Sequence, residues 1–149
     1  QVMSAQTEIE LRIPALIPDD YIFDVSLRLS LYKRIASCKD KRDLDDIQVE
    51  LIDRFGLLPQ PTKNLIHIAK LRLKAQTIGI SRIEASDTGG SIEFSDNTNV
   101  DPMQIIGLIQ KQPAMYKMVG ASKLKFIKGN QGAQERFTLI TNLLNEFIK

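Results

Sequence analysis

Three helical hydrophobic patterns follow one another between Asp24 and Gly79, and short strand patterns replace them from Ile80 onward. In the first part, apolar residues recur at spacings of three and four, which is the period of one helix face. In the second part, they alternate with polar residues in short runs. We predict helices over about residues 24–37, 40–55 and 61–79. This succession limits the fold to a helical group followed by a small sheet.

Capping residues mark the ends of these helices. Asp24 and Asp40 stand where a carboxylate can accept hydrogen bonds from the free N–H groups of a helix's first turn. Gly56 supplies a left-handed residue after the second helix, Pro59 follows it, and Pro61 suits the first turn of the third helix. The second helix is thus bounded on both sides.

The first helix has an apolar side and a charged side. Lys33 and Arg34 are expected to face outward. Four apolar positions recur at helical spacing and are expected to face the core, namely Val25, Leu29, Tyr32, and Ile35 or Ala36.

Strands and two further helices are expected in the rest of the chain. Glu8–Ile13 alternates polar and apolar residues, as a half-buried strand does, and Asp87–Gly90 is a turn sequence between two later strands. After the helical group we predict strands over about residues 80–85, 91–94, 116–119 and 123–127, and helices over 101–110 and around Phe137. The fold class is therefore α+β, with helices packed on a small, mostly antiparallel sheet and a β-β-α-β-β-α order after the helical N-terminal half.

The length of 149 residues suffices for one domain with its own core. The first seven residues are polar and without period, so we predict a linker over residues 1–7 and one regulatory domain over residues 8–149. Because the chain begins at Gln1, we expect it to be a piece of a longer polypeptide. The third helix is apolar around most of its circumference, which favours one core shared by helices and sheet over two lobes.

Composition excludes several functional classes. The apolar runs, such as Ile105–Ile109, are far shorter than the roughly 20 residues that span a bilayer. We therefore expect no membrane partner. Cys38 is the single cysteine and cannot form a disulfide within the chain, so we expect a cytoplasmic protein. The 20 basic and 18 acidic residues are too balanced to indicate a nucleic-acid-binding protein by themselves.

The sequence contains no pattern typical of catalysis. His67, the single histidine, lies among aliphatic residues of the third helix, where a structural role is commoner than general-base catalysis. Gly89 and Gly90 lack the spacing of a phosphate-binding loop. We therefore expect no catalytic, cofactor-binding or metal-binding residue in this chain, and a small enzyme with an unrecognised site is one rival hypothesis.

Four acidic residues form a stripe along the second helix, and they are Asp43, Asp46, Glu50 and Asp53. Their spacings of three, four and three place them within a sector of about 80°, because each helical residue advances by 100°. The neighbouring side, which is expected in the core, carries Leu44, Ile47, Leu51 and Phe55. Like charges at these spacings destabilise a helix by about 0.2 to 0.5 kcal/mol per pair. A stripe that lowers helix stability without a local gain is typical of a functional surface. We predict docking on arginine or lysine side chains of a partner, with a solvated acidic face as the simpler alternative.

A basic strip lies along the third helix and consists of Lys63, His67, Lys70 and Lys74. Lysines with long apolar stems commonly form the solvated side of a helix that is otherwise buried. We interpret the strip in that way. The alternative function is a nucleic-acid-binding module that contacts phosphates through Lys63, Lys70 and Lys74.

Six sequence blocks lie in one order between about Glu8 and Phe147. They are Glu10–Pro14, Ile17–Ile22, Arg28–Ser37, Glu50–Pro59, Gly107–Pro113 and Leu124–Ile127. Together these blocks resemble the C-terminal domain of bacterial transcription-repair coupling factors (Mfd).

The resemblance implies a parent protein that is an ATP-dependent DNA translocase, with ATP and magnesium as cofactors. Such a parent displaces stalled RNA polymerase and recruits UvrA for nucleotide excision repair, and its DNA contacts belong to the motor. The resemblance also implies that this domain is non-catalytic. It would dock on the N-terminal UvrB-like module of the same polypeptide, mask the UvrA-binding surface and restrain the motor.

In that family an acidic pair of the domain faces arginines of the UvrB-like module. The matching positions in this sequence are Glu50 and Asp53. Asp43 and Asp46 are supported by the helical pattern alone.

Overall fold

The structure is a computed structural model that describes residues 6–148. The chain divides into two compact units. One contains residues 13–73, and the other combines the N-terminal residues through Arg12 with those from Lys74 onward. Most of the predicted linker over residues 1–7 lies outside the described residues. Within it, Thr7 is buried, and its hydroxyl donates a hydrogen bond to the Ile80 carbonyl over 2.6 Å.

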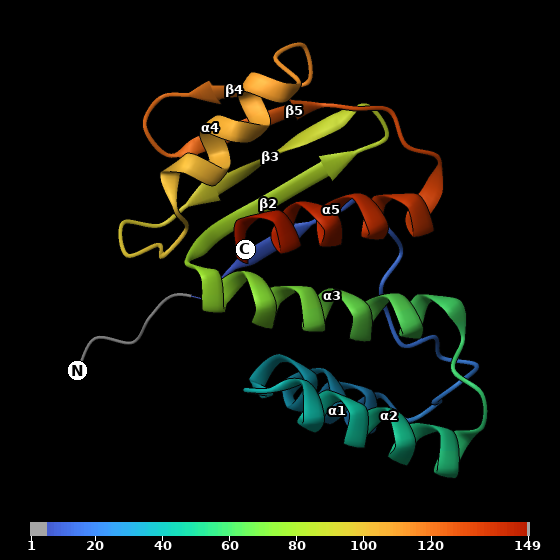
Figure 1. The fold of residues 1–149 in the computed structure, drawn as a ribbon. Helices are drawn as coiled ribbons and strands as arrows, with labels where there is room; N and C mark the ends of the chain where they lie inside the picture. Colours follow the sequence, from blue (N-terminus) through green and yellow to red (C-terminus); the bar gives the residue numbers. More distant parts are fainter. Residues whose placement is uncertain (1–5, 149) are drawn as a thin grey trace. The chain divides into compact units, whose positions relative to one another are not determined.

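The unit of residues 13–73 is helical (Figure 1). Its helices are α1 (Val25–Ser37), α2 (Lys41–Phe55) and most of α3 (Gln60–Ile78). The predicted caps are present, since the Asp24 carboxylate accepts from two N–H groups of α1 and that of Asp40 accepts from the Asp43 N–H. Gly56 follows α2 with a φ of 89°, a conformation that glycine adopts at little cost.

A hydrophobic core lies inside this unit. Its buried residues are Ile17, Ile22, Leu31, Ile35, Leu44, Ile47, Leu51, Leu58, Ile66 and Ala69. The acidic helix α2 therefore contributes the predicted apolar side, although Phe55 is only partly buried.

The prediction for the inner face of α1 is wrong at two positions. Val25 and Leu29 are each 58% exposed, whereas Leu31 and Ile35 are buried. The helix carries two apolar stripes on different sides, and the one through Leu27, Leu31 and Ile35 packs on the core. Periodicity alone does not distinguish the two stripes.

The other unit contains the sheet. Its strands are β1 (Glu8–Glu10), β2 (Ile80–Ser86), β3 (Gly89–Phe94), β4 (Tyr116–Val119) and β5 (Lys123–Ile127). They pair in the order β1-β2-β3-β5-β4, and every pair is antiparallel except β1 with β2. Helices α4 (Pro102–Lys111) and α5 (Gly132–Ile148) complete this unit, which confirms the predicted α+β class and the β-β-α-β-β-α order.

Strand β1 is shorter than the predicted Glu8–Ile13. Arg12 has a φ of 54°, which breaks the extended conformation. Arg136 of α5 donates hydrogen bonds to the carbonyls of Leu11 (2.6 Å) and Arg12 (3.3 Å), so neither group is left for a strand ladder.

None of the helices described between residues 6 and 148 is long and apolar enough to cross a membrane.

Candidate docking surface on helix α2

The four predicted acidic residues lie on the side of α2 that faces away from its core. Leu44 and Leu51 are fully buried on the neighbouring side. Asp43, Asp46 and Asp53 are exposed, whereas Glu50 is partly covered. The structure therefore presents the stripe to solvent as the helical arithmetic predicts.

Glu50 is held by two arginines. Arg34 of α1 forms a bidentate contact, with Nη1 2.8 Å from Oε2 and Nη2 3.1 Å from Oε1 of Glu50. Arg54 lies 3.6 Å from the same carboxylate. The hydrogen bonds from Arg34 lower the pKa of Glu50, and the same contact raises the pKa of Arg34. Glu50 is thus kept ionised, and its side chain is fixed before any partner arrives.

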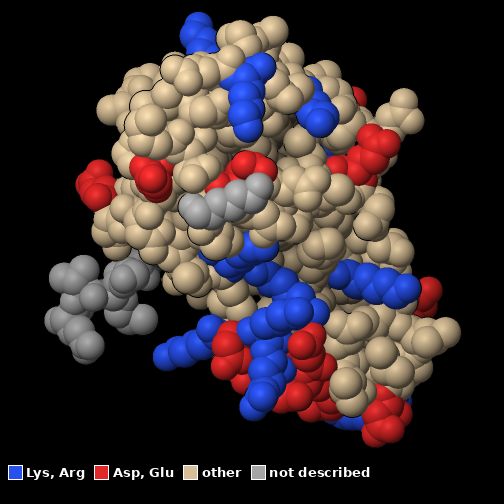
Figure 2. Space-filling view, in the orientation of Figure 1, with Lys and Arg blue, Asp and Glu red and all other residues tan. Residues whose placement is uncertain are grey.

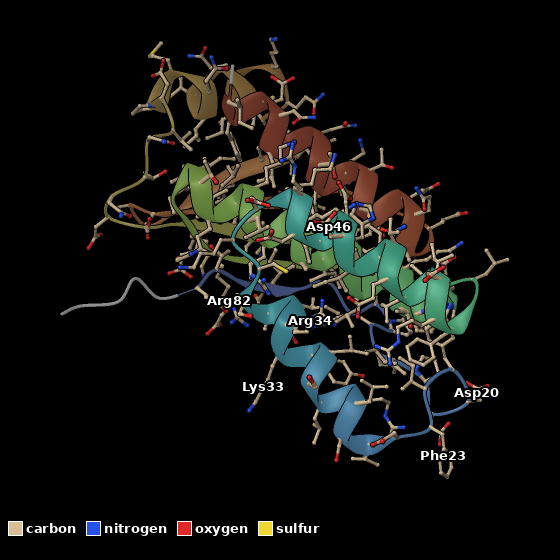
Figure 3. The ribbon with its side chains drawn as sticks, turned by 90° about the horizontal axis from the view of Figure 1, so that it is seen from below. Asp20, Phe23, Lys33, Arg34, Asp46 and Arg82 are labelled. Atoms are coloured by element: carbon tan, nitrogen blue, oxygen red, sulfur yellow. The ribbon has the colours of Figure 1, made fainter. Side chains whose placement is uncertain are left out.

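The other three carboxylates of the stripe are available. Within residues 6–148, the side chains of Asp43, Asp46 and Asp53 make no hydrogen bond or ion pair. Figure 3 shows Asp46 on α2 and Arg34 on the neighbouring α1. Since Glu50 is already paired, the uncompensated negative charge of the stripe belongs to the three aspartates.

Exposed apolar side chains accompany the aspartates, and sequence reasoning missed them. Val49 is 67% exposed and lies three residues after Asp46 and four before Asp53, so it shares their side of the helix. Ile52, which is 40% exposed, follows one turn later. The signal was present in the sequence, since both residues fall outside the apolar side of Leu44 and Leu51. The surface combines carboxylates with apolar side chains along one edge, which suits a protein partner.

The basic strip on α3 is partly engaged within the chain. Lys70 forms an ion pair with Asp45 of α2 over 2.7 Å, and the Lys74 ammonium donates to the Asn145 side chain. The pKa of His67 is lowered by burial and by the nearby charge of Lys70. The charge of Lys70 is therefore compensated by Asp45, whereas the neutral amide of Asn145 leaves the charge of Lys74 in place. Figure 2 shows basic and acidic side chains side by side in the region where Figure 1 draws α1 and α2.

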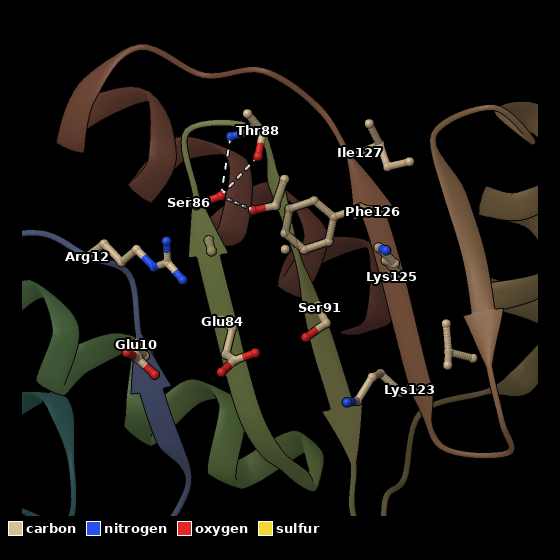
Figure 4. A pocket seen from close by; sticks show the side chains of 14 residues that line it. Glu10, Arg12, Glu84, Ser86, Thr88, Ser91, Lys123, Lys125, Phe126 and Ile127 are labelled. Atoms are coloured by element: carbon tan, nitrogen blue, oxygen red, sulfur yellow. Dashed lines mark hydrogen bonds between the residues drawn. The ribbon is translucent and has the colours of Figure 1, made fainter.

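A shallow hollow of about 610 Å³ lies on the outer face of the sheet (Figure 4). Glu84 and Ser91 project into it from β2 and β3, and Lys123 projects from β5. The hydrogen bond from Arg82 lowers the pKa of Glu84, which makes this carboxylate a weaker base. Among the described residues, no group of three or more His, Cys, Asp and Glu side chains could hold a metal ion. The hollow is thus a shallow, solvent-exposed surface lined by charged side chains and hydroxyl groups.

Cys38 is a poor nucleophile in this fold. Burial is the main cause that raises the pKa of its thiol, and the charge of Asp43 adds to the effect. A thiol with a raised pKa is protonated at neutral pH and reacts slowly. Cys38 is therefore suited to a structural role in this fold.

Comparisons with known proteins identify the family of the chain. The family model of the TRCF domain matches residues 11–105. The transcription-repair-coupling factor of Escherichia coli (strain K12) is 50% identical over 143 residues, which is 96% of this chain and 12% of that protein. The factor of Haemophilus influenzae is 49% identical over 144 residues, which is 97% of this chain and 13% of that protein.

A solved structure has the same fold. The crystal structure of the C-terminal domain of a transcription-repair coupling factor matches with a TM-score of 0.75 and 24% identity, over 95% of this chain and 93% of that one. The chain spans only 12% to 13% of the length of the two curated relatives. On these matches, the chain belongs to the TRCF domain family of transcription-repair coupling factors.

Proposed function

We propose that this chain is a non-catalytic regulatory domain that docks, through the outer face of α2, on the N-terminal UvrB-like module of the same polypeptide. Docking covers the surface to which UvrA binds and restrains the motor of the parent. The parent is an ATP-dependent DNA translocase of the cytoplasm, which uses ATP and magnesium, displaces stalled RNA polymerase and recruits UvrA. DNA contacts belong to the motor and not to this domain.

The observation that carries the proposal is that the acidic stripe contains both a paired carboxylate and an unpaired one. Asp53 has no partner among the described residues, while Glu50 is held by Arg34. A carboxylate has about four acceptor positions, and the fork of Arg34 occupies two of them, so Glu50 can still accept from a second cation. Glu50 therefore offers a fixed acceptor and Asp53 a free one, one helical turn apart. Arginines of a partner suit this arrangement because guanidinium groups bind carboxylates in a directed way.

A contact of this kind suits regulation within one polypeptide. Domains joined by a linker meet at an effective concentration near the millimolar range, so a weak interface stays mostly closed. Binding of RNA polymerase elsewhere on the parent opens the interface only if it favours the open arrangement by more than the contact stabilises the closed one. A charged and half-exposed interface is weak enough to be opened in this way.

UvrA capture by the full-length parent tests the proposal. The double variant Glu50→Ala, Asp53→Ala is compared with the unchanged protein and with Asp96→Asn, which alters an exposed aspartate in the loop after β3. Higher capture by the double variant alone, with unchanged circular dichroism, supports docking through α2. Equal capture by all three proteins contradicts it. If the isolated domain instead binds DNA with a strong salt dependence, the nucleic-acid alternative through Lys63, Lys70 and Lys74 is favoured.

A further inference from the structure

A second surface of the helical unit exposes large apolar side chains. Phe23, just before α1, is 89% exposed, and Val25 and Leu29 are each 58% exposed. Val25 and Leu29 are four residues apart on one side of α1 and are therefore neighbours. In Figure 3, Phe23 projects away from the ribbon beside Asp20. A contiguous exposed apolar group of this kind is a common mark of a binding surface.

The backbone that carries Phe23 is fixed. Arg28 of α1 donates hydrogen bonds from Nη1 to the carbonyls of Ile22 (2.7 Å) and Phe23 (3.0 Å). On the other side, the N–H groups of Tyr21 and Ile22 both donate to the Pro18 carbonyl over 3.1 Å. The backbone at Phe23 is thus held on both sides, which lowers the ordering cost when a partner covers the exposed ring.

The turn is also anchored to α2. The Tyr21 hydroxyl lies 2.8 Å from the carbonyl oxygen of Gly56 and 3.2 Å from that of Leu51. The Tyr21 ring packs edge-on against Phe55 with a centroid distance of 5.9 Å. Ile22, next to Phe23, is buried in the core, so the backbone of the turn is anchored on this side as well.

Three carboxylates lie near Phe23 in the sequence. Asp19, Asp20 and Asp24 are exposed and lie within four residues of Phe23, while Arg28 donates to backbone carbonyls. Lys33 is exposed and follows Leu29 by four residues on the same side of α1, so the negative charge is concentrated at the Phe23 end of the apolar group. The Asp24 carboxylate caps α1 and stays on the surface. The negative charge disfavours nucleic acid and anionic membranes as occupants, since both would be repelled.

We propose that Phe23, Val25 and Leu29 form a docking site for another protein, whose surface offers an apolar pocket rimmed by lysine or arginine. Phe23 is the anchor, because a rigid, exposed aromatic residue provides large buried area at low entropic cost. Asp19 and Asp20 face the basic rim and steer the approach. This site is separate from the α2 stripe, and it stands whether or not the α2 surface docks on a UvrB-like module.

Photocrosslinking in the cell identifies the occupant. The photoreactive p-benzoylphenylalanine replaces Phe23 in the protein as the cell produces it, and in a control it replaces Ile127, which is 63% exposed on β5. The expected result is an adduct specific to position 23, on a second protein, at an apolar site whose neighbouring surface is rich in Lys and Arg. Adducts to nucleic acid, to lipid, to another part of the same polypeptide or to a second copy overturn the proposal, as does the absence of any adduct above the control.

Affinity measurements with the crosslinked protein complete the test. Phe23→Ser or Leu29→Ser should weaken binding at least tenfold, and Ile127→Ser should not change it. Asp19→Asn with Asp20→Asn should reduce the dependence of affinity on salt, because two charges that face the basic rim are removed. The three apolar-to-serine variants alter exposed side chains, and circular dichroism checks that they fold. Unchanged affinity in both Phe23→Ser and Leu29→Ser would overturn the site.

Discussion

Arg34 of α1 donates hydrogen bonds from both terminal nitrogens to Glu50 of α2, at 2.8 Å and 3.1 Å from the two carboxylate oxygens. The side chains of the two residues are 46% and 36% exposed, so water still reaches the pair. The pair therefore orients α1 and α2 relative to each other but is expected to contribute little free energy to folding. The pair also fixes the carboxylate on which the proposed docking depends.

We predict a small coupling energy between these two residues. A double-mutant cycle with Arg34→Met and Glu50→Gln should give about 0.2 to 1 kcal/mol in urea unfolding, since half-exposed ion pairs are screened by solvent. The coupling should shrink in 1 M salt. A cycle between Arg34 and Asp20, an exposed residue of the same unit before α1, serves as the control and should give no coupling. A coupling above about 2 kcal/mol would contradict the solvent-screened geometry.

The pair also predicts a pH dependence. The pKa of Glu50 is lowered in the folded state by Arg34, so the contact contributes stability above the ordinary glutamate pKa. This contribution is lost as the pH falls through the lowered pKa. The free energy of unfolding of Arg34→Met should therefore approach that of the unchanged protein at acidic pH and differ from it at neutral pH. A difference that stays constant over this range would show that the lowered pKa plays no part.

The two sides of α2 should respond differently to truncation. Leu51→Ala removes a fully buried side chain and should cost about 2 to 5 kcal/mol, because a cavity is left in the core. Val49→Ala alters a side chain that is 67% exposed and should change stability by less than about 0.5 kcal/mol. Urea unfolding of both variants measures this contrast. A large loss in Val49→Ala would mean that the apolar edge of the acidic surface is covered within the chain.

Element limits could be predicted from the sequence where local chemistry sets them. Asp24 and Asp40 cap helices because their carboxylates reach N–H groups two or three residues away. Residues 40–56 contain the cap, the apolar side and the terminal glycine of α2, so its ends, its buried side and its acidic stripe followed from the sequence, whereas the exposed Val49 and Ile52 did not. The acidic residues form a stripe because their spacings of three and four place them on one side of this helix.

Contacts between distant residues could not be predicted in this way. Arg34 and Glu50 lie on different helices, so their pairing follows from how α1 packs and not from any spacing. The exposed side of α1 was misassigned because Val25 and Leu29 continue an apolar stripe as regular as the buried one. The early end of β1 depends on Arg136, which lies 125 residues beyond Leu11.

Arg136 provides the last prediction, since it is a buried cation without a carboxylate partner among the described residues. It is 7% exposed, and it donates to the carbonyls of Leu11 and Arg12 and from Nε to the Asn130 side chain. Arg136→Met keeps much of the volume but leaves buried acceptors without donors, at about 1 to 3 kcal/mol for each such group. We expect a loss of roughly 2 to 5 kcal/mol in urea unfolding, in line with the removal of one partner from a buried charged contact.

Arg54→Met is the matched control for Arg136→Met, because Arg54 is half exposed and lies 3.6 Å from Glu50. It should cost less than about 1 kcal/mol. Hydrogen exchange adds a readout that global stability does not give. In Arg136→Met, protection should fall most in β1 and in the β2 amides that pair with it, because the backbone at Leu11 and Arg12 loses its donor. Uniform loss of protection across the sheet would contradict a role for Arg136 in ending and anchoring β1.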